Sequence, residues 1–278
     1  MKNKKESLIT LVLVLTFLTG LSLLLYPTIS NWWNSFHQSQ VIENFSKTAD
    51  NLDKDVYRQV LDQADAYNSS IADQGIRWVM SEEEKKDYEE QLNVAGNGVM
   101  CYVEIPKIDC ELPVYHGVDE AVLEIAAGHI AGSSLPVGGP GTHCMISGHR
   151  GLPRATLFSK LDQLQEGDYF MLHTLNELLT YEVDQIRIVL PDELEDLRIV
   201  PGQDLCTLIT CTPYGINSHR LLVRGHRIEN DLSAAITAEA RQIDKLIVAS
   251  VVAAPILLIL LIWMLITTRD KKRKVKNL

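Results

Sequence analysis

The sequence predicts a mainly β barrel or sandwich, preceded by a helical segment and held between two apolar helices. Two observations carry this prediction. From Val99 onward, short apolar runs broken by Pro, Gly and Asp follow one another, and their number and spacing favour an all-β domain. Near each end lies an uncharged apolar run of roughly 20 residues, which as a helix crosses a hydrocarbon core about 30 Å thick.

The first apolar run covers residues 8–26 and follows a short lysine-rich tail, residues 1–7. A cleaved signal peptide is the alternative, but the run is long for that role and no small-x-small cleavage site follows it. The second run covers residues 246–268 and leads into a basic tail, residues 269–278. Because Lys- and Arg-rich ends stay in the cytoplasm, we expect both termini inside the cell membrane and the domain between them outside.

Residues 27–98 are predicted to be an extracellular helical segment, because apolar side chains recur there at helical spacing. Ser81 followed by Glu84 predicts a capping box at the start of one helix. Residues 99–228 form the predicted β domain, whose length of about 130 residues can bury a full core. Its apolar runs are 99–105, 112–114, 144–147, 169–172, 178–183, 186–189, 205–211 and 221–223. A linker helix, residues 229–245, is predicted to join the domain to the second span.

The net charge of −10 is unevenly distributed along the chain. Of the 26 basic and 36 acidic residues, the two tails hold nine and two, which leaves 17 basic and 34 acidic residues between them. So acidic a domain argues against a nucleic-acid partner, which needs a basic face. It suits a basic partner, although keeping the domain soluble explains the charge equally well.

The five cysteines all lie between the two spans. An odd number leaves at least one thiol unpaired within the chain. No CxxC pair occurs, so neither a zinc site nor any other metal or cofactor is predicted. Catalysis is the best reason for a free extracellular thiol. Cys206 lies within an apolar run and is expected in the core, whereas Cys211 ends that run and is expected at the rim of the domain.

Three side chains at predicted strand ends are candidates for acyl-transfer chemistry. Cys211 precedes a Thr-Pro-Tyr-Gly turn, and Arg220 opens the next apolar run, so its guanidinium is suited to donate to an oxyanion. His149 follows another run and precedes Gly151, which lets a substrate backbone come close. Thr210 and Tyr214 flank the cysteine and are candidates for the substrate pocket.

The spacing alone leaves other assignments open. The competing histidines are His129, His143, His219 and His226, and the competing arginines are Arg150, Arg224 and Arg227. His116 and His173 are interpreted as turn and surface residues. No carboxylate stands out as a third member, which indicates a Cys-His-Arg site. Such a site works through the minority of molecules that hold a thiolate and an imidazolium together.

The chain resembles the class C sortases, the pilus-assembling transpeptidases of Gram-positive bacteria, from about Asn97 to Arg227. The matching segments are GNGVM at 96–100, IPKI at 105–108, LPVYHG at 112–117, SLPVGG at 134–139, SGHRGLP at 147–153, LITCTPYG at 208–215 and NSHRLLVRG at 217–225. A span at each end of the domain also fits this class. The resemblance implies an eight-stranded sortase barrel.

By this resemblance, His149, Cys211 and Arg220 are the catalytic triad. The implied substrate is a pilin with an LPxTG-like sorting signal, cleaved between Thr and Gly through a thioester on Cys211. A lysine amine of the next pilin would resolve the thioester. A wall-anchoring sortase that uses a peptidoglycan amine is the alternative enzyme, and a membrane assembly scaffold is the alternative without catalysis.

One segment departs from the class C pattern. Many members carry an Asp-Pro-aromatic triplet on a lid that covers the cysteine, but residues 72–80 read ADQGIRWVM. Asp73 and Trp78 are present without the triplet. We expect Trp78 to serve as the lid residue, and the alternative is that it packs against the barrel wall.

Overall fold

The computed structural model describes residues 2–152 and 155–230, which fall into two compact units. The first unit, as far as it is described, is the apolar part of helix α1 (Lys2–Asp50) up to Ser30. The second unit begins at Asn31 and contains, among its described residues, the rest of α1, three further helices and the barrel. The predicted second span, the basic tail and nearly all of the predicted linker helix lie outside the described residues.

Helix α1 contains an apolar stretch that begins at Leu8. Its most apolar window has a mean hydropathy of 2.6, and none of that window is buried. By length and composition, this stretch can cross a membrane, although a signal sequence fits the same description. The helix continues through Pro27, even though proline cannot donate the usual backbone hydrogen bond.

Helices α2 (Lys54–Gln74) and α3 (Glu82–Glu90) begin at side-chain caps. Asp53 caps α2 by accepting a hydrogen bond from the backbone N–H of Asp55 at 2.9 Å. The predicted capping box of α3 is confirmed: the Glu84 N–H donates to Ser81 Oγ at 3.2 Å, and the Ser81 N–H donates to Glu84 Oε2 at 2.8 Å. These caps satisfy backbone donors that the first helical turn leaves unpaired.

The β domain is a closed eight-stranded barrel, as the resemblance implied, with the strand order β1-β2-β3-β4-β7-β8-β6-β5. The strands are β1 (Val99–Ile105), β2 (Cys110–His116), β3 (Ala127–His129), β4 (Thr142–Gly148), β5 (Tyr169–Thr174), β6 (Glu177–Val189), β7 (Asp204–Thr212) and β8 (His219–Ile228). The short helix α4 (Glu120–Leu123) and the 3₁₀ turns η1 (Pro106–Ile108), η2 (Leu161–Gln163) and η3 (Glu195–Leu197) lie in the connections. β2–β3 and β4–β7 are parallel pairs, and the other neighbours are antiparallel.

Two strand predictions were wrong. The apolar runs 178–183 and 186–189 belong to one strand, β6, because the register against β8 shifts between Val183 and Gln185 instead of breaking. A bulge of this kind bends a strand without ending it. The prediction also missed β3, since its three residues, Ala-Gly-His, are too few to show strand periodicity.

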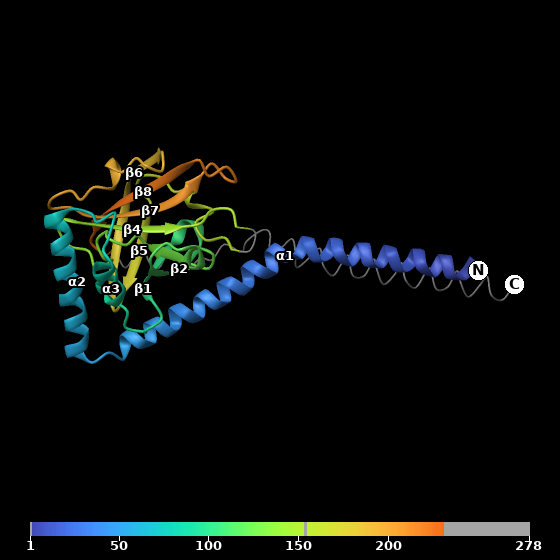
Figure 1. The fold of residues 1–278 in the computed structure, drawn as a ribbon, viewed down its shortest axis with the longest axis horizontal. Coiled ribbons are helices and arrows are strands. Elements are labelled where there is room, and N and C mark those ends of the chain that lie inside the picture. Colours follow the sequence, from blue (N-terminus) through green and yellow to red (C-terminus); the bar gives the residue numbers. More distant parts are fainter. Residues whose placement is uncertain (1, 153–154, 231–278) are drawn as a thin grey trace. The chain divides into compact units, whose positions relative to one another are not determined.

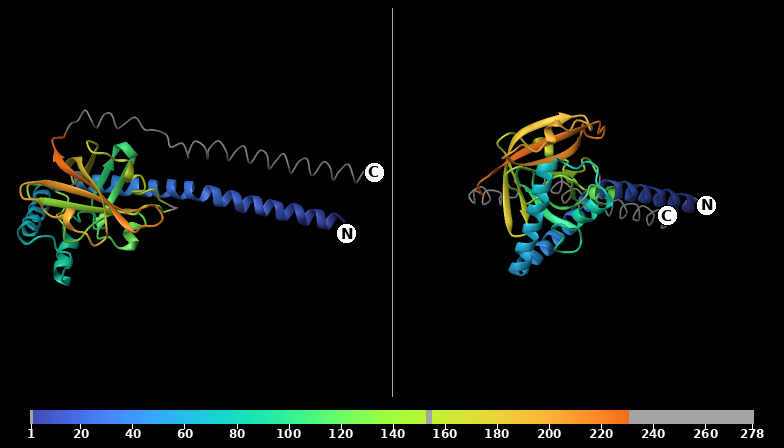
Figure 2. Two further views of the ribbon diagram at one scale, coloured as in Figure 1. Left: turned by 90° about the horizontal axis from the view of Figure 1, so that it is seen from above. Right: turned by 60° about the vertical axis from the view of Figure 1, so that its left-hand side comes forward.

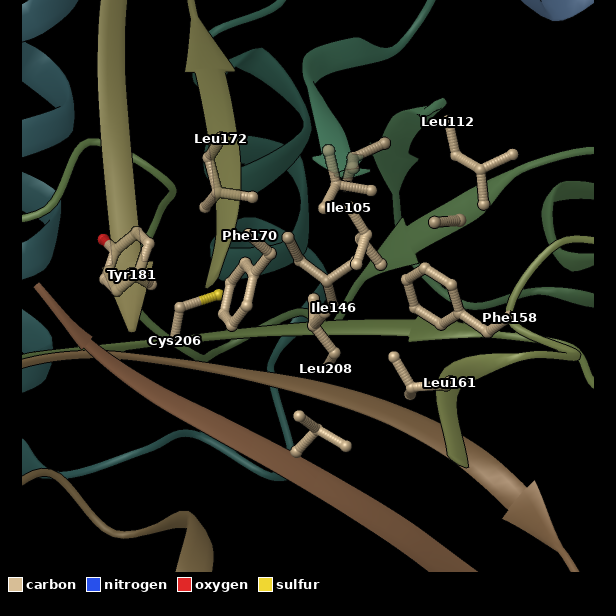
Figure 3. Packing of buried hydrophobic residues seen from close by; sticks show 14 of the residues in the cluster. Ile105, Leu112, Ile146, Phe158, Leu161, Phe170, Leu172, Tyr181, Cys206 and Leu208 are labelled. Carbon is tan, nitrogen blue, oxygen red and sulfur yellow. The ribbon is translucent and has the colours of Figure 1, made fainter. Parts of the chain in front are cut away.

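The barrel interior holds the main hydrophobic core. Figure 3 shows Ile146 and Leu208 between the rings of Phe158 and Phe170. Phe170 stacks on Tyr181 with ring centroids 5.5 Å apart. Such burial is the main favourable contribution to the free energy of folding, at about 25 cal/mol per Å² of apolar surface.

A second cluster joins the helices to the barrel. Phe45 of α1, Ile71 of α2 and Tyr88 of α3 are buried together with Met100 of β1. In both views of Figure 2, α2 and α3 lie along one side of the barrel. The helical segment before the barrel is therefore packed onto it, and the connection between α2 and α3 runs along the barrel surface.

Candidate active site

The thiol and the guanidinium singled out in the sequence lie opposite each other across β7 and β8. Cys211 and Arg220 are direct partners in this antiparallel ladder. Directly opposite residues of an antiparallel pair project their side chains from the same face of the sheet. The six-residue connection from Pro213 to Ser218 sets this register, which strand alternation in the sequence could not reveal.

Strand β4 brings His149 to the same place through its parallel pairing with β7. Ser147 and Ile209 are the last partners in this ladder, and the Thr210 hydroxyl then donates to the Gly148 carbonyl at 2.7 Å. Since side chains alternate along a strand, Cys211 lies on the face of Ile209, and His149 follows directly after the end of β4, two residues beyond Ser147. His149, Cys211 and Arg220 therefore form a row across the neighbouring ends of β4, β7 and β8, with His149 directly after β4.

This row lies on the outer face of the barrel wall. Leu208 and Val223 point into the interior core, so Ile209 and Leu222 point outward, where they pack with Met145. Two residues further along the same face come Cys211 and Arg220. All three side chains of the row are partly exposed, so a substrate can reach them. The outward apolar residues form a floor next to the row.

Close packing holds the backbone on both sides of His149. A Cβ atom on Gly148 would lie 2.6 Å from the ring of Phe158, so only glycine fits without a shift. At Gly151, whose φ is +84°, the ring of Tyr214 lies about as close, 3.0 Å from where a Cβ would be. The Phe158 N–H also donates to the His149 carbonyl at 3.2 Å.

The competing histidines occupy different environments. His129 and His143 are fully buried, and burial lowers the pKa of each imidazole to about 4. His219 pairs with Thr212 at the end of the hairpin, and its Nδ1 lies 2.9 Å from Ser218 Oγ. His226 lies further along β8, with its Nδ1 3.8 Å from a carboxylate oxygen of Asp184.

His116 and His173 were interpreted as turn and surface residues; both are partly exposed, but they lie in strands instead of turns. His116 ends β2, and its two ring nitrogens lie 2.9 Å from the Gly98 carbonyl and 2.8 Å from the Gln91 carbonyl. His173 belongs to β5 and its Nε2 lies 2.9 Å from Glu104 Oε2. His116 connects the end of β2 to the segment between α3 and β1, and His173 connects β5 to β1. Their polar partners lie far away in the sequence, so the sequence gives no sign of them.

The cysteines are all free thiols, but they differ in burial. Cys101, Cys144 and Cys206 are buried in the core, as predicted for Cys206. Burial raises the pKa of the Cys110 thiol to about 12 and raises the pKa values of Cys101 and Cys144 well above the ordinary range. Such thiols carry almost no thiolate at neutral pH. Cys211 is partly exposed at the barrel rim, where a substrate can reach it.

The predicted lid segment connects α2 to α3. Ile76 packs on the apolar floor next to the row, a contact that the sequence analysis missed. The Arg77 N–H donates to the Gly132 carbonyl at 3.0 Å and holds the segment to the barrel. The Trp78 side chain remains 43% exposed, and Asp73 is exposed near the end of α2.

The two candidates for the substrate pocket differ in burial. Thr210 is buried, and its hydroxyl is engaged with the Gly148 carbonyl, so it faces inward beneath Cys211. Tyr214 is 62% exposed on the β7–β8 connection. Among the described residues, no group of three or more His, Cys, Asp or Glu side chains could hold a metal ion.

Comparison with known proteins identifies the family. A family model described as the sortase domain matches residues 103–228. Sortase C1 from Streptococcus agalactiae is 49% identical, with a TM-score of 0.68 over 69% of this chain and 100% of that chain. The chain belongs to the sortase family. Sortases are cysteine transpeptidases of cell-wall protein sorting.

Two other sortases extend the comparison. A lid mutant of sortase A from Corynebacterium diphtheriae is 45% identical, with a TM-score of 0.62 over 66% of this chain and 100% of that chain. Sortase D of Bacillus subtilis is 31% identical over 129 residues, which are 45% of this chain and 62% of that protein. The chain thus spans about three fifths of the length of that relative.

Proposed function

We propose that this sortase is a membrane-anchored class C enzyme that polymerises pilins. It cleaves an LPxTG-like sorting signal between Thr and Gly and transfers the acyl group to a lysine amine of another pilin. The row of His149, Cys211 and Arg220 at the neighbouring ends of three adjacent strands carries this proposal. The likeness to a sortase named C1 supports the class.

The row suggests a role for each side chain. The Cys211 thiolate attacks the carbonyl carbon of the threonine and forms a tetrahedral oxyanion. The Arg220 guanidinium donates hydrogen bonds to that oxyanion. His149 gives its proton to the leaving glycine amine, and the thioester forms as the C–N bond breaks. His149 then takes a proton from the attacking lysine amine, and an isopeptide bond replaces the thioester.

We also propose that the segment containing Asp73 and Trp78 is a lid. Its Ile76 covers part of the apolar floor beside the row, and its backbone is bonded to Gly132. The related sortase A from Corynebacterium diphtheriae was studied as a lid mutant, which supports a lid in this family. In this chain, the segment contains Asp73 and Trp78 but lacks the Asp-Pro-aromatic triplet of many class C enzymes.

The proposed location is the outer face of the cell membrane, with both termini in the cytoplasm. The apolar stretch of α1 and the lysines before it support the N-terminal half of this topology. The acidic charge of the domain between the predicted spans suits a lysine-bearing acceptor.

Full-length protein in detergent, an LPxTG-type peptide and two competing amines test the function. The amines are a lysine-containing peptide and a peptidoglycan-derived peptide. Wild type should form a thioester, detected by intact mass, and transfer the acyl group to lysine. C211A should form none. Turnover by H149A and R220A should fall about 100-fold or more, whereas H219A should keep its activity.

Each contrary outcome has its own meaning. Peptide cleavage by C211A would disprove the proposed cysteine mechanism, whereas neither a thioester nor cleavage by wild type would leave the scaffold alternative. Transfer to the peptidoglycan amine alone would make the protein a wall-anchoring sortase. Loss of turnover in H219A but not in H149A would show that the histidine is wrongly assigned.

A further inference from the structure

Arg150 directly follows His149, and its side chain reaches across to the strand that carries Cys211. Its Nη1 donates to the Thr212 hydroxyl oxygen at 3.2 Å. Its Nη2 pairs with the carboxylate of Asp162 in η2. The side chain is only 9% exposed. One guanidinium therefore links the residue after the histidine, the residue after the cysteine and the connection that follows β4.

This link lies where the backbone pairing of β4 and β7 ends. Ser147 and Ile209 are the last partners in the ladder, and the bond from Thr210 to the Gly148 carbonyl extends the contact by one residue. His149 and Cys211 come next, and no backbone ladder joins β4 to β7 there. The hydrogen bond from Arg150 to Thr212 joins the two segments again, one residue beyond His149 and Cys211.

The arrangement is symmetric about the reacting pair. His149 is the middle residue of the triplet 148–150, and Cys211 is the middle residue of the triplet 210–212. The outer residues of the two triplets are hydrogen bonded to each other, at one end by the Thr210 hydroxyl and at the other by the Arg150 guanidinium. Both backbones are thereby fixed on either side of the imidazole and the thiol.

Burying the Arg150 guanidinium costs free energy of solvation, which favours a functional role for this side chain. A buried guanidinium loses hydration and must recover it from its partners. Its Nη groups have partners, but its Nε is buried without a hydrogen bond. Asp162, the charged partner, is itself 46% exposed, which weakens the ion pair. A lysine could not replace the planar fork that reaches two acceptors at once.

We propose that Arg150 is a positioning residue of this sortase, which holds His149 in register with Cys211 by binding Thr212. The inference rests on the proposed function of that pair. Misplacing a reacting group by about 1 Å can cost about 100-fold in rate. Loss of Arg150 should therefore lower kcat while the sorting-signal peptide still binds.

The test uses full-length protein in detergent, an LPxTG-type peptide and iodoacetamide. R150A should lower kcat by about 100-fold with KM changed by less than about twofold. The pH profile of Cys211 alkylation should move towards that of H149A, because the thiolate loses its imidazolium partner. T212V removes only the acceptor and should shift both measurements in the same direction. R150K should recover little of the loss, because an ammonium group cannot bond both acceptors as the planar guanidinium does.

Arg224 offers a matched control. Its guanidinium is partly buried and pairs through two bonds, at 2.9 and 3.1 Å, with Asp184 on the neighbouring strand β6. R224A should lower the melting temperature without moving the alkylation profile. The double variant R150A/T212V should be no slower than R150A, because both changes remove the same bond.

Wild-type kcat and a wild-type alkylation profile in R150A would overturn the proposal, even if its melting temperature fell. If R150A does not fold, T212V decides in the same way. The proposed function fails separately: it is wrong if C211A still cleaves the peptide. If C211A is inactive while R150A and T212V behave as wild type, only the positioning role is wrong.

Discussion

Acidification should destabilise the barrel through two buried imidazoles, those of His129 and His143. Burial lowers the pKa of each to about 4, compared with 6.5 for an ordinary histidine. His129 illustrates why the neutral form is kept. Its Nε2 lies 2.9 Å from the Ser134 carbonyl and donates to it, which leaves Nδ1, 3.0 Å from the Tyr88 hydroxyl, as the acceptor of the neutral ring. A second ring proton would remove that acceptor.

The direction and size of the change in the free energy of unfolding follow from the linkage between protonation and folding. Between pH 6.5 and 4, the unfolded chain takes up a proton at each imidazole and the folded chain does not. Stability is therefore complete above pH 6.5 and is lost as the pH falls towards 4. Each histidine contributes up to about 1.4 kcal/mol per pH unit. Two of them remove roughly 5 kcal/mol between pH 6.5 and 4.5, a large part of a typical stability of about 5–15 kcal/mol.

Urea unfolding of the full-length protein in a non-ionic detergent, followed by near-UV circular dichroism, measures this loss. The free energy of unfolding is compared at several pH values for wild type, H129Q and H143Q. Each variant should show a slope shallower by up to about 1.4 kcal/mol per pH unit below pH 6.5 and the wild-type slope above pH 7. Equal slopes for all three proteins below pH 6.5 would refute the reasoning.

Two substitutions at glycine and one at tryptophan test packing around the site. G148A should cost about 1–3 kcal/mol of stability, measured by urea unfolding, because the added methyl group would lie 2.6 Å from the Phe158 ring; an unchanged midpoint would contradict this. G132A, whose methyl group would meet the lid backbone at 2.1 Å, should speed alkylation of Cys211 by displacing the lid. W78A should speed the same reaction if Trp78 covers the thiol, and an unchanged rate would remove the lid role.

Gly96 supplies the control for the lid experiment. Its φ of +67° is similar to the +83° of Gly132, but a Cβ there would meet nothing within 4 Å. G96A therefore introduces comparable backbone strain without a collision. Faster alkylation of Cys211 in both variants would indicate general loosening instead of lid displacement.

The sequence predicted the class of fold and the positions of most strands, but it did not predict how the site residues pair across the strands. Apolar runs located most strands, because the pattern of buried and exposed side chains in a strand is set by a few neighbouring residues. The same reasoning split β6 at Asp184, since a bulge and a turn look alike without the partner strand. It could not pair Cys211 with Arg220, because register depends on the conformation of the connection between them.

Contacts distant in the sequence were the least predictable. The bond from Arg150 to Thr212 joins residues that only the parallel β4–β7 pairing brings together. Ile76 gave no signal in the sequence, because an isoleucine near the end of a helix is unremarkable until the barrel face beneath it is known.

The strand order has a consequence for synthesis of the protein. β8 lies between β7 and β6, so the long edge of β6 stays unpaired until the last strand arrives. Cys211 and Arg220 lie in β7 and β8, the last two strands, whereas His149 directly follows β4, which is made well before them. Long-range pairings of this kind form late in folding. A chain interrupted before β8 therefore exposes the unpaired backbone groups of β6, which favours aggregation, and it lacks Arg220. Activity is expected only after the whole barrel has closed.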